Sequence, residues 1–165
     1  GYVMSLLPQQ FTASSFDAFD RIIGYLSSQH VLSLCCQSKF DFWCASCFYL
    51  FEPNTLSFLL VSEHHTRHTQ IMVENPYVAG SVSEQTEEVA KIRGVQFVGK
   101  ITKLEGSEEQ AARAHYNKRF PIAAGLPAPI WRVALDEVKL TDNSAGFGSK
   151  FTLERKEPED RNVSC

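Results

Sequence analysis

The chain has 165 residues, of which 44% are hydrophobic and 21% charged, and its formal net charge is −3. This length and composition predict a single globular domain over residues 1–153, followed by a polar, disordered tail over residues 154–165. The slight acidic excess and the lack of a basic run exclude a general nucleic-acid binder. No apolar stretch reaches the roughly 20 residues of a membrane-spanning helix, so no membrane association is expected.

The first half of the chain predicts a helix, three strands and a second helix. After Ser14 and Ser15, either of which can cap a helix, apolar residues recur at helical spacing as far as Leu26. The runs HVLSLCCQ, FWCASCFYLF and TLSFLLVS then alternate with the turn-like segments SKFD and EPN. This pattern is typical of three antiparallel strands in succession. A polar helix is expected over residues 66–74, where the following NP ends it.

The second half predicts strands at YVAGSVS, IRGVQFVGKITKLE and IWRVALDEVKLTDN, and a final strand at FGSKFTLER. SEEQAARAHYNKRF is expected to be a helix with Ser107 and Gln110 at capping-box spacing, and PIAAGLPAP a loop. In the third of these strands the apolar residues change face, which predicts a β-bulge at Asp136-Glu137. Six to seven mostly antiparallel strands with two to three peripheral helices indicate an α+β domain built on a closed or nearly closed barrel.

The five cysteines predict a reduced, cytoplasmic protein. Their number is odd and two of them are adjacent, which does not suit a disulfide framework. Cys44 and Cys47 have C-x-x-C spacing, but residues three apart in a strand point to opposite faces, so the two sulfurs should diverge. Buried packing is the favoured interpretation of the pair over a metal or redox site.

The segment SEHHTRHTQ, residues 62–70, carries the most concentrated polar chemistry of the chain. Its three histidines, His64, His65 and His68, invite a metal site, but the glutamate of an H-E-x-x-H motif is absent. Solvated surface histidines are a second interpretation. A phosphate site uses more of the segment, because a helix beginning near Thr66 offers unpaired N–H groups and Arg67 and His68 add donors. The sequence therefore favours anion binding and leaves the other two interpretations open.

The segments WCASCFYLF, TRHTQ, IRGVQFVG, YNKRFP, LTDN and GFGSK carry a family resemblance. Together with an NP before the next strand, they resemble the pyridoxamine-phosphate-oxidase-like split barrels, and most closely the small bacterial YhbP-type proteins of that superfamily. In that superfamily a Ser/Thr-Arg-Lys triplet opens a short helix after a strand, and Thr66-Arg67-His68 stand in its place. The resemblance spans residues 20–151.

This resemblance implies a split β-barrel homodimer that binds FMN in a cleft between subunits. Ser62, Thr66, Arg67 and His68 would surround the phosphate, with Arg67 as the principal charge. The isoalloxazine ring would lie along the strand at Cys47, Phe48 and Tyr49, and Gln96 would contact its edge. The following residues are thus the expected cofactor-binding set: Ser62, Thr66, Arg67, His68, Cys47, Phe48, Tyr49 and Gln96.

His68 replaces the usual lysine of the triplet, and Lys150 near the C-terminus has no Arg-His pair beside it. The resemblance therefore supports an FMN-binding flavoprotein, an oxidoreductase of unnamed substrate, rather than a vitamin B6 oxidase, and nominates no catalytic residue. A rival from another class is a non-catalytic dimer that binds flavin, haem or a small anion as a sensor or store, with His64 or His65 as haem ligand. A third is a dimer with an empty cleft that contacts only proteins.

Overall fold

The computed structural model describes residues 7–156, and all nine strands of this part join one antiparallel sheet. The strands are β1 (Phe11–Ala13), β2 (Val31–Gln37), β3 (Phe42–Phe48), β4 (Leu50–Glu52), β5 (Ser57–Val61), β6 (Tyr77–Ser83), β7 (Arg93–Lys103), β8 (Ile130–Asp142) and β9 (Lys150–Arg155). The α-helices are α1 (Leu7–Gln10), α2 (Ala18–Ser28), α3 (Arg67–Glu74) and α4 (Gly106–Arg119). Short 3₁₀ turns lie at η2 (Val89–Lys91), η3 (Pro121–Gly125) and η4 (Asn143–Ala145).

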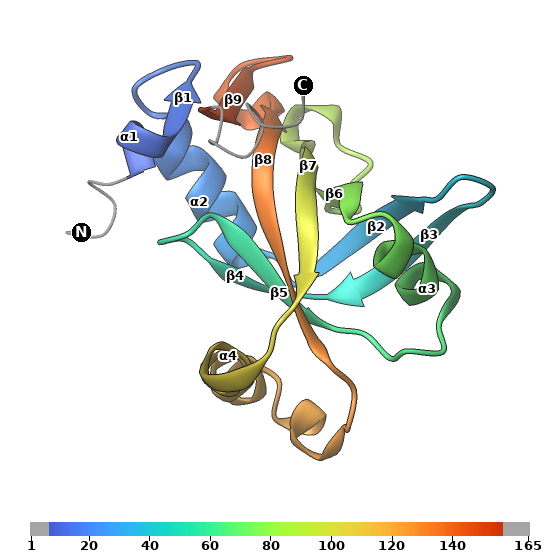
Figure 1. The fold of residues 1–165 in the computed structure, drawn as a ribbon. Helices are drawn as coiled ribbons and strands as arrows, with labels where there is room; N and C mark the ends of the chain where they lie inside the picture. The colour runs from blue at the N-terminus through green and yellow to red at the C-terminus, as the bar shows by residue number, and fades with distance from the viewer. Residues whose placement is uncertain (1–6, 157–165) are drawn as a thin grey trace.

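The sheet curls into a barrel that remains split. Its main path runs β1-β9-β8-β7-β6-β2-β3, while β5 pairs with β4 on one side and with the first part of β8 on the other. Because β8 pairs first with β5 and later with β9, its long strand bends around the barrel. No ladder joins β3 to β5 within the described residues, so the barrel is not closed there, and α3 packs beside β2 and β3 (Figure 1). The predicted α+β split barrel is therefore confirmed, with nine strands instead of six or seven.

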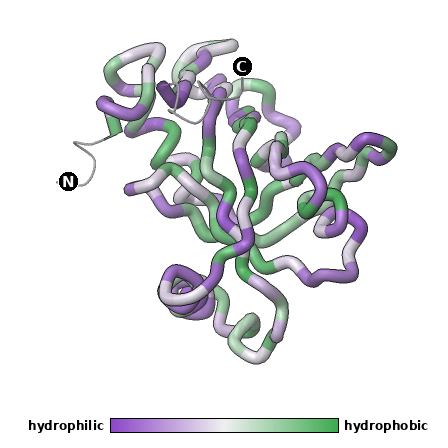
Figure 2. Tube along the Cα trace, in the orientation of Figure 1, coloured by the Kyte–Doolittle hydropathy of each residue, from purple (hydrophilic) through white to green (hydrophobic). Residues whose placement is uncertain are grey.

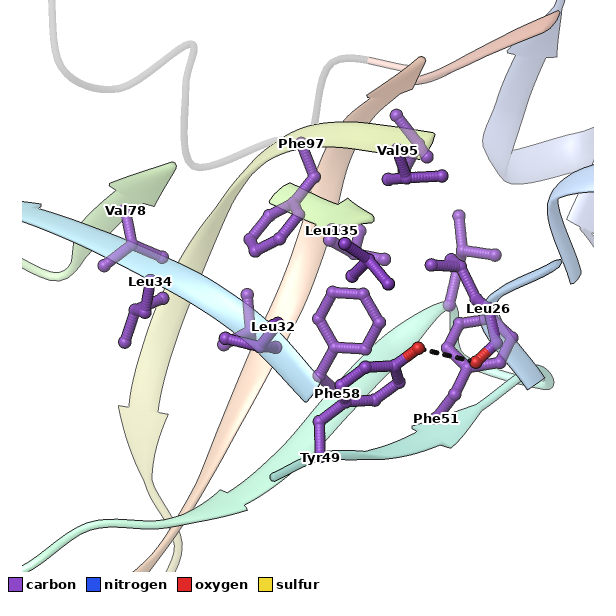
Figure 3. Packing of buried hydrophobic residues seen from close by; sticks show 14 of the residues in the cluster. Leu26, Leu32, Leu34, Tyr49, Phe51, Phe58, Val78, Val95, Phe97 and Leu135 are labelled. Atoms are coloured by element: carbon purple, nitrogen blue, oxygen red, sulfur yellow. Dashed lines mark hydrogen bonds between the residues drawn. The ribbon is translucent and has the colours of Figure 1, made fainter. Parts of the chain in front are cut away.

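The barrel interior holds the main hydrophobic core. The Phe58 ring lies 4.7 Å from Tyr49, 5.8 Å from Phe51 and 5.2 Å from Phe97, measured between centroids. Tyr49 also donates its hydroxyl to the carbonyl oxygen of Leu26 in α2, 2.7 Å away (Figure 3). The strands that meet at the centre carry hydrophobic colours, whereas α4 is coloured mainly hydrophilic (Figure 2). Strand alternation thus supplies the core, and α2 closes one side of it.

The β-bulge predicted in β8 is confirmed. The ladder passes from the pair Val98–Glu137 to the pair Gly99–Leu135, so Asp136 is the extra residue. At the same step a side chain on Gly99 would meet the β8 backbone, since a Cβ there would lie 2.5 Å from the carbonyl oxygen of Ala134. Glycine therefore lets the two strands approach where β8 changes face.

Two predicted caps are wrong. α2 begins at Ala18 with Asp17 in the N-cap position, and the Ser15 hydroxyl donates to the Asp17 carboxylate at 2.7 Å instead of capping the helix. α4 begins one residue before Ser107, which therefore lies inside the first turn, and the N-cap position is Glu105. Tertiary context has moved both helix starts by a few residues, which is the usual error of boundary predictions.

The run FWCASCFYLF forms two strands instead of the single strand predicted. β3 pairs with β2, whereas β4 pairs with β5, and Tyr49 between them donates its backbone N–H to His30 at 3.0 Å. The predicted loop after α4 contains the 3₁₀ turn η3. β1 was not predicted. β1, β4 and η3 escape a periodicity argument because each has at most five residues.

β9 extends to Arg155, which is two residues into the segment predicted as a tail. Residues 157–165, the remainder of that segment, lie outside the described residues. Among residues 7–156, no helix is long and apolar enough to cross a membrane.

Candidate functional site

A pocket of about 590 Å³ lies between β3, the end of β5, the start of α3 and the chain from α4 to β8. Its wall has a polar part contributed by Ser62, Glu63, Thr66 and His68, and an apolar part contributed mainly by the segment after α4. The lining residues are Ser46, Cys47, Phe48, Val61, Ser62, Glu63, Thr66, His68, Tyr116, Phe120, Ile122, Ala123, Leu126 and Ala128. A pocket of this size and composition suits a small molecule with an apolar body and a polar end.

The polar part forms where β5 passes into α3. The backbone N–H of Ser62 donates to Pro129 at 3.1 Å, which fixes the end of β5 against the chain entering β8. Thr66 then takes the N-cap position of α3, and its hydroxyl accepts the N–H of Thr69 at 3.3 Å. The predicted helix start near Thr66 is confirmed. Because N–H groups of a first helical turn lack partners within the helix, this end attracts anions.

Three hydroxyls and one imidazole form a connected cluster at this point. Ser62 Oγ and His68 Nε2 share a hydrogen bond of 2.8 Å, and Thr66 Oγ1 lies 3.3 Å from the same nitrogen. Thr66 also donates to Thr69 Oγ1 at 2.6 Å, and Ser62 contacts the same oxygen. The cluster holds the His68 ring in a fixed orientation, with Nε2 among hydroxyl groups that both donate and accept.

Burial lowers the pKa of His68 below its usual value of 6.5. The ring is therefore mainly neutral at pH 7, because removal from water penalises its charged form. A bound anion would oppose this effect by favouring the imidazolium. His68 is thus a donor whose charge depends on what occupies the pocket.

The apolar part contains a cluster of aromatic rings. The Phe48 and Phe120 centroids are 5.6 Å apart, and those of Tyr116 and Phe120 are 5.0 Å apart. The Tyr116 hydroxyl donates to the carbonyl oxygen of Phe48 at 3.3 Å, joining α4 to β3. The His30 ring stacks on the Phe48 ring, with the two centroids 6.1 Å apart. This wall was missed in the sequence, where its signal was the apolar composition of the segment FPIAAGLPAP.

The thiol of Cys47 and the phenol of Tyr116 also line the pocket, and both stay protonated at neutral pH. Burial raises the pKa of Cys47 to about 11, with a smaller contribution from Cys44. Burial also raises the pKa of Tyr116 to about 12, followed by the effect of Cys47. Neither group is a proton acceptor or a nucleophile at pH 7.

Arg67 does not line this pocket. Its guanidinium bonds to the carboxylate of Asp41, with Nε 3.1 Å from Oδ2, and lies 3.9 Å above the Trp43 ring. The Asp41 hydrogen bond raises the pKa of Arg67, and the same bond lowers the pKa of Asp41. The sequence placed Arg67 beside the phosphate, whereas its side chain borders a separate depression with Asp41 and Gln70, and His68 lines the pocket. Consecutive residues in a first helical turn point in different directions, which separates the two.

Two other residues of the expected set also lie outside the pocket. The Tyr49 side chain is buried in the barrel core, where it bonds to Leu26. Gln96 is exposed on β7 and borders a separate depression with Val98 and Lys139. The structure therefore brings together Ser62, Thr66, His68, Cys47 and Phe48 from that set.

The histidine-rich segment does not form a metal site in the described residues. His64 and His65 are exposed and are not among the residues that line the pocket. Within residues 7–156, no group of three or more His, Cys, Asp or Glu side chains is arranged to hold a metal ion. The predicted divergence of Cys44 and Cys47 is confirmed, because Cys44 is exposed and Cys47 packs against the core. The predicted buried packing is therefore wrong for Cys44, whose position on β3 faces the opposite side of the strand.

Solved structures share this fold across most of the chain. A heme-binding protein from Mycobacterium smegmatis superposes with a TM-score of 0.69 at 18% identity, covering 82% of this chain and 57% of that protein. An FAD-binding protein from Mesorhizobium loti gives 0.62 at 15% identity, covering 89% and 98%. A putative pyridoxamine 5'-phosphate oxidase from Listeria innocua gives 0.61 at 13% identity, covering 74% of this chain and 96% of that protein. These structures share the split-barrel fold of the chain.

The sequence itself identifies the family. The chain is 48% identical over 134 residues to a UPF0306 protein from Yersinia pseudotuberculosis, which covers 81% of this chain and 91% of the relative. No family model matches the chain. At this identity and coverage, the chain belongs to the UPF0306 family, and the resemblance inferred from the sequence is confirmed.

Proposed function

We propose that the chain binds FMN in the pocket beside α3, with the phosphate at the helix start and the isoalloxazine ring against the apolar wall. The observation that carries this proposal is the convergence of Ser62, Thr66 and His68 on one side of an otherwise apolar pocket. A dianionic phosphate needs donors and positive potential, which hydroxyls, an imidazole and a helix N-terminus supply. The FAD-binding neighbour with the same fold adds support.

The donor set is suited to a phosphate that is bound weakly enough to exchange. No lysine or arginine lines the pocket, because the guanidinium of Arg67 is bonded to Asp41 outside it. Glu63 adds a carboxylate to the pocket wall. His68 is therefore the one side chain lining the pocket that can become positively charged. The charge of the phosphate would be balanced by His68 in its protonated form and by the dipole of α3.

Bound FMN would supply the redox chemistry of an oxidoreductase, and the protein would supply position and polarity. Phe48 and Phe120 would offer apolar surface to a flat ring system, and the buried Cys47 thiol would remain neutral beside it. The same pocket in a protein without turnover would make the chain a flavin sensor or store.

Titration of FMN fluorescence against wild type, His68→Ala and His64→Ala tests this proposal. A charge-assisted hydrogen bond contributes about 1.5–3 kcal/mol, so His68→Ala should weaken FMN binding about 10- to 100-fold near pH 6. His64→Ala is the matched control, because it removes an exposed imidazole from the same segment and should change affinity less than about threefold.

Riboflavin separates the phosphate contact from the ring contact. It lacks the phosphate, so wild type and His68→Ala should bind it with similar affinity. Equal losses for FMN and riboflavin would mean that His68 contacts the ring or supports the pocket, and would remove the phosphate from the α3 start. Equal losses for the two histidine variants would contradict the choice of pocket.

Haem is the second candidate, favoured by a single imidazole in an apolar pocket and by the heme-binding neighbour. Its ligand would be His68, because the sequence-based candidates His64 and His65 do not line the pocket. An imidazole is a common axial ligand of haem iron. The absorption spectrum after reconstitution discriminates the two cofactors, since only haem gives an intense Soret band, which should change in position for His68→Ala.

We also propose that two copies associate into a homodimer about a two-fold axis. β3 is an end of the described sheet path, and its Phe42 and Phe48 side chains are 70% and 56% exposed. Exposed aromatic side chains beside a sheet edge favour association with another chain. Sedimentation at micromolar concentration should give twice the chain mass of 18.6 kDa, and a stable monomer would contradict it.

A further inference from the structure

Two cysteine side chains outside the pocket lie directly opposite each other on neighbouring strands. Cys35 of β2 and Cys44 of β3 are register partners, and their sulfur atoms are 3.5 Å apart. Both residues are exposed. Opposed residues of antiparallel strands have Cα atoms roughly 4.5 or 5.5 Å apart, and both values fall within the range that a disulfide bond spans. The backbone therefore already has the spacing that a covalent link requires.

The other two described cysteines are placed differently. Cys36 is buried opposite Trp43, and Cys47 faces inward opposite Leu32. Burial raises the pKa of Cys36 to about 12 and that of Cys47 to about 11. Strand alternation has thus divided the cysteines between two faces, with the accessible pair on the outer one.

Cys35 and its neighbour Cys36 border a groove of about 400 Å³, and of the two only Cys35 is exposed. Phe42, Tyr77, Val98 and Asp136 line this groove with it, among others. A small molecule can approach the sulfur from this side. Burial, followed by the neighbouring Cys44, raises the pKa of Cys35, so little of it is thiolate at neutral pH and its exchange reactions should become faster as the pH rises.

We propose that Cys35 and Cys44 form a reversible disulfide bond by exchange with a low-molecular-weight disulfide such as oxidised glutathione. One thiol loses its proton and attacks a sulfur of the small disulfide, whose S–S bond breaks and releases one thiolate. The second cysteine then loses its proton and attacks the protein sulfur of the mixed disulfide, which releases the second thiolate. Two electrons pass from the protein to the small disulfide, and excess small thiol reverses both steps.

The new bond would tie the end strand of the sheet path to its neighbour. Ser46, Cys47 and Phe48 follow Cys44 on β3 and line the pocket. The oxidation state of the outer face would therefore restrain the strand that forms one pocket wall. This inference rests on the thiol geometry alone and does not depend on which molecule the pocket binds.

Incubation of the reduced full chain with oxidised glutathione, followed by intact mass measurement and peptide mapping, tests the proposal. All proteins compared carry Cys165→Ser, so that Cys165 cannot retain a glutathione. The protein with both Cys35 and Cys44 should then lose two hydrogen atoms without retaining a glutathione adduct, and mapping should join the Cys35 and Cys44 peptides within one chain. Adding Cys35→Ser or Cys44→Ser should instead leave one glutathione on the remaining cysteine of the pair, because nothing resolves the mixed disulfide.

Three results would overturn the proposal. The protein with both Cys35 and Cys44 could retain the glutathione adduct to the same extent as the two variants that lack one of them, which would mean that the second thiol does not resolve it. Non-reducing electrophoresis could show covalent dimers joined through Cys44, which would place the link between copies. A joined pair that includes Cys36 or Cys47 would contradict the division of the thiols between faces.

Discussion

The barrel interior and the pocket are both lined by aromatic side chains, but their rings have different surroundings. Phe58 in the barrel is fully buried among three other rings. In the pocket wall, Phe48 is 56% exposed and Ile122 is 93% exposed. Burial of apolar surface stabilises a fold by roughly 25 cal/mol per Å². The interior has gained this stabilisation on folding, whereas the pocket wall keeps apolar surface that a bound molecule would remove from water.

The largest effect expected from this comparison is on stability. Phe58→Ala would leave a cavity among Tyr49, Phe51 and Phe97, and should lower the free energy of unfolding by about 3–5 kcal/mol. Urea denaturation followed by tryptophan fluorescence measures it. Ile122→Ala is the pocket counterpart and should change the free energy of unfolding by less than about 0.5 kcal/mol, since its side chain is already in water.

In a binding assay the order of the two effects should be reversed, with the larger loss of affinity for Ile122→Ala. Ile122→Ala should weaken ligand binding, because it removes apolar contact area from the wall. Phe58→Ala should bind with an unchanged affinity whenever it is folded. A Phe58→Ala protein as stable as wild type, or an Ile122→Ala protein that unfolds readily, would contradict the assignment of these two regions.

The next expected effect is a dependence of FMN affinity on pH. Burial lowers the pKa of His68 below 6.5 in the free protein, and a bound phosphate should raise it. Binding then takes up a proton, so affinity should fall as the pH rises from the free-state pKa to the bound-state pKa. Below this window the imidazole is charged in both states, and above it the imidazole is neutral in both.

His68→Ala supplies the reference for this measurement. The FMN phosphate gains charge near its own second pKa of about 6, and this change affects both proteins equally. The ratio of wild-type to variant affinity should therefore decrease between about pH 5 and about pH 8. A constant ratio across that range would show that His68 does not carry charge in the complex.

Much of the fold could be predicted because strand patterns repeat along the sequence. The long strands β7 and β8, the helix start at Thr66 and the bulge at Asp136 all leave signals in the order of apolar residues. The division of FWCASCFYLF into two strands leaves no such signal, since its apolar residues are continuous. There the break at Tyr49 depends on pairing with β5, a strand later in the sequence.

The candidate site was predicted in part for a related reason. Thr66 and His68 were expected to lie together because they open a helix that follows a strand, and both line the pocket. The wall formed by Tyr116, Phe120 and Ile122 comes from a segment about fifty residues later. A single sequence does not show which distant segments meet, so this wall and the Asp41 partner of Arg67 appear only in three dimensions.

The smallest effect should come from a change at Arg67. This residue belongs to the phosphate site expected from the sequence but does not line the pocket in the structure. Its ion pair with Asp41 is exposed, with 49% and 35% of the two side chains accessible, and such pairs contribute roughly 0.2–1 kcal/mol. Arg67→Ala should therefore lower the free energy of unfolding by less than about 1 kcal/mol and FMN affinity less than about threefold. Asp41→Ala is the matched control: it releases the guanidinium and leaves the arginine in place. The opposite outcome would be that Arg67→Ala weakens FMN binding as strongly as His68→Ala, and that Asp41→Ala strengthens it. Arg67 would then leave Asp41 to hold the phosphate, as the triplet Thr66-Arg67-His68 predicts.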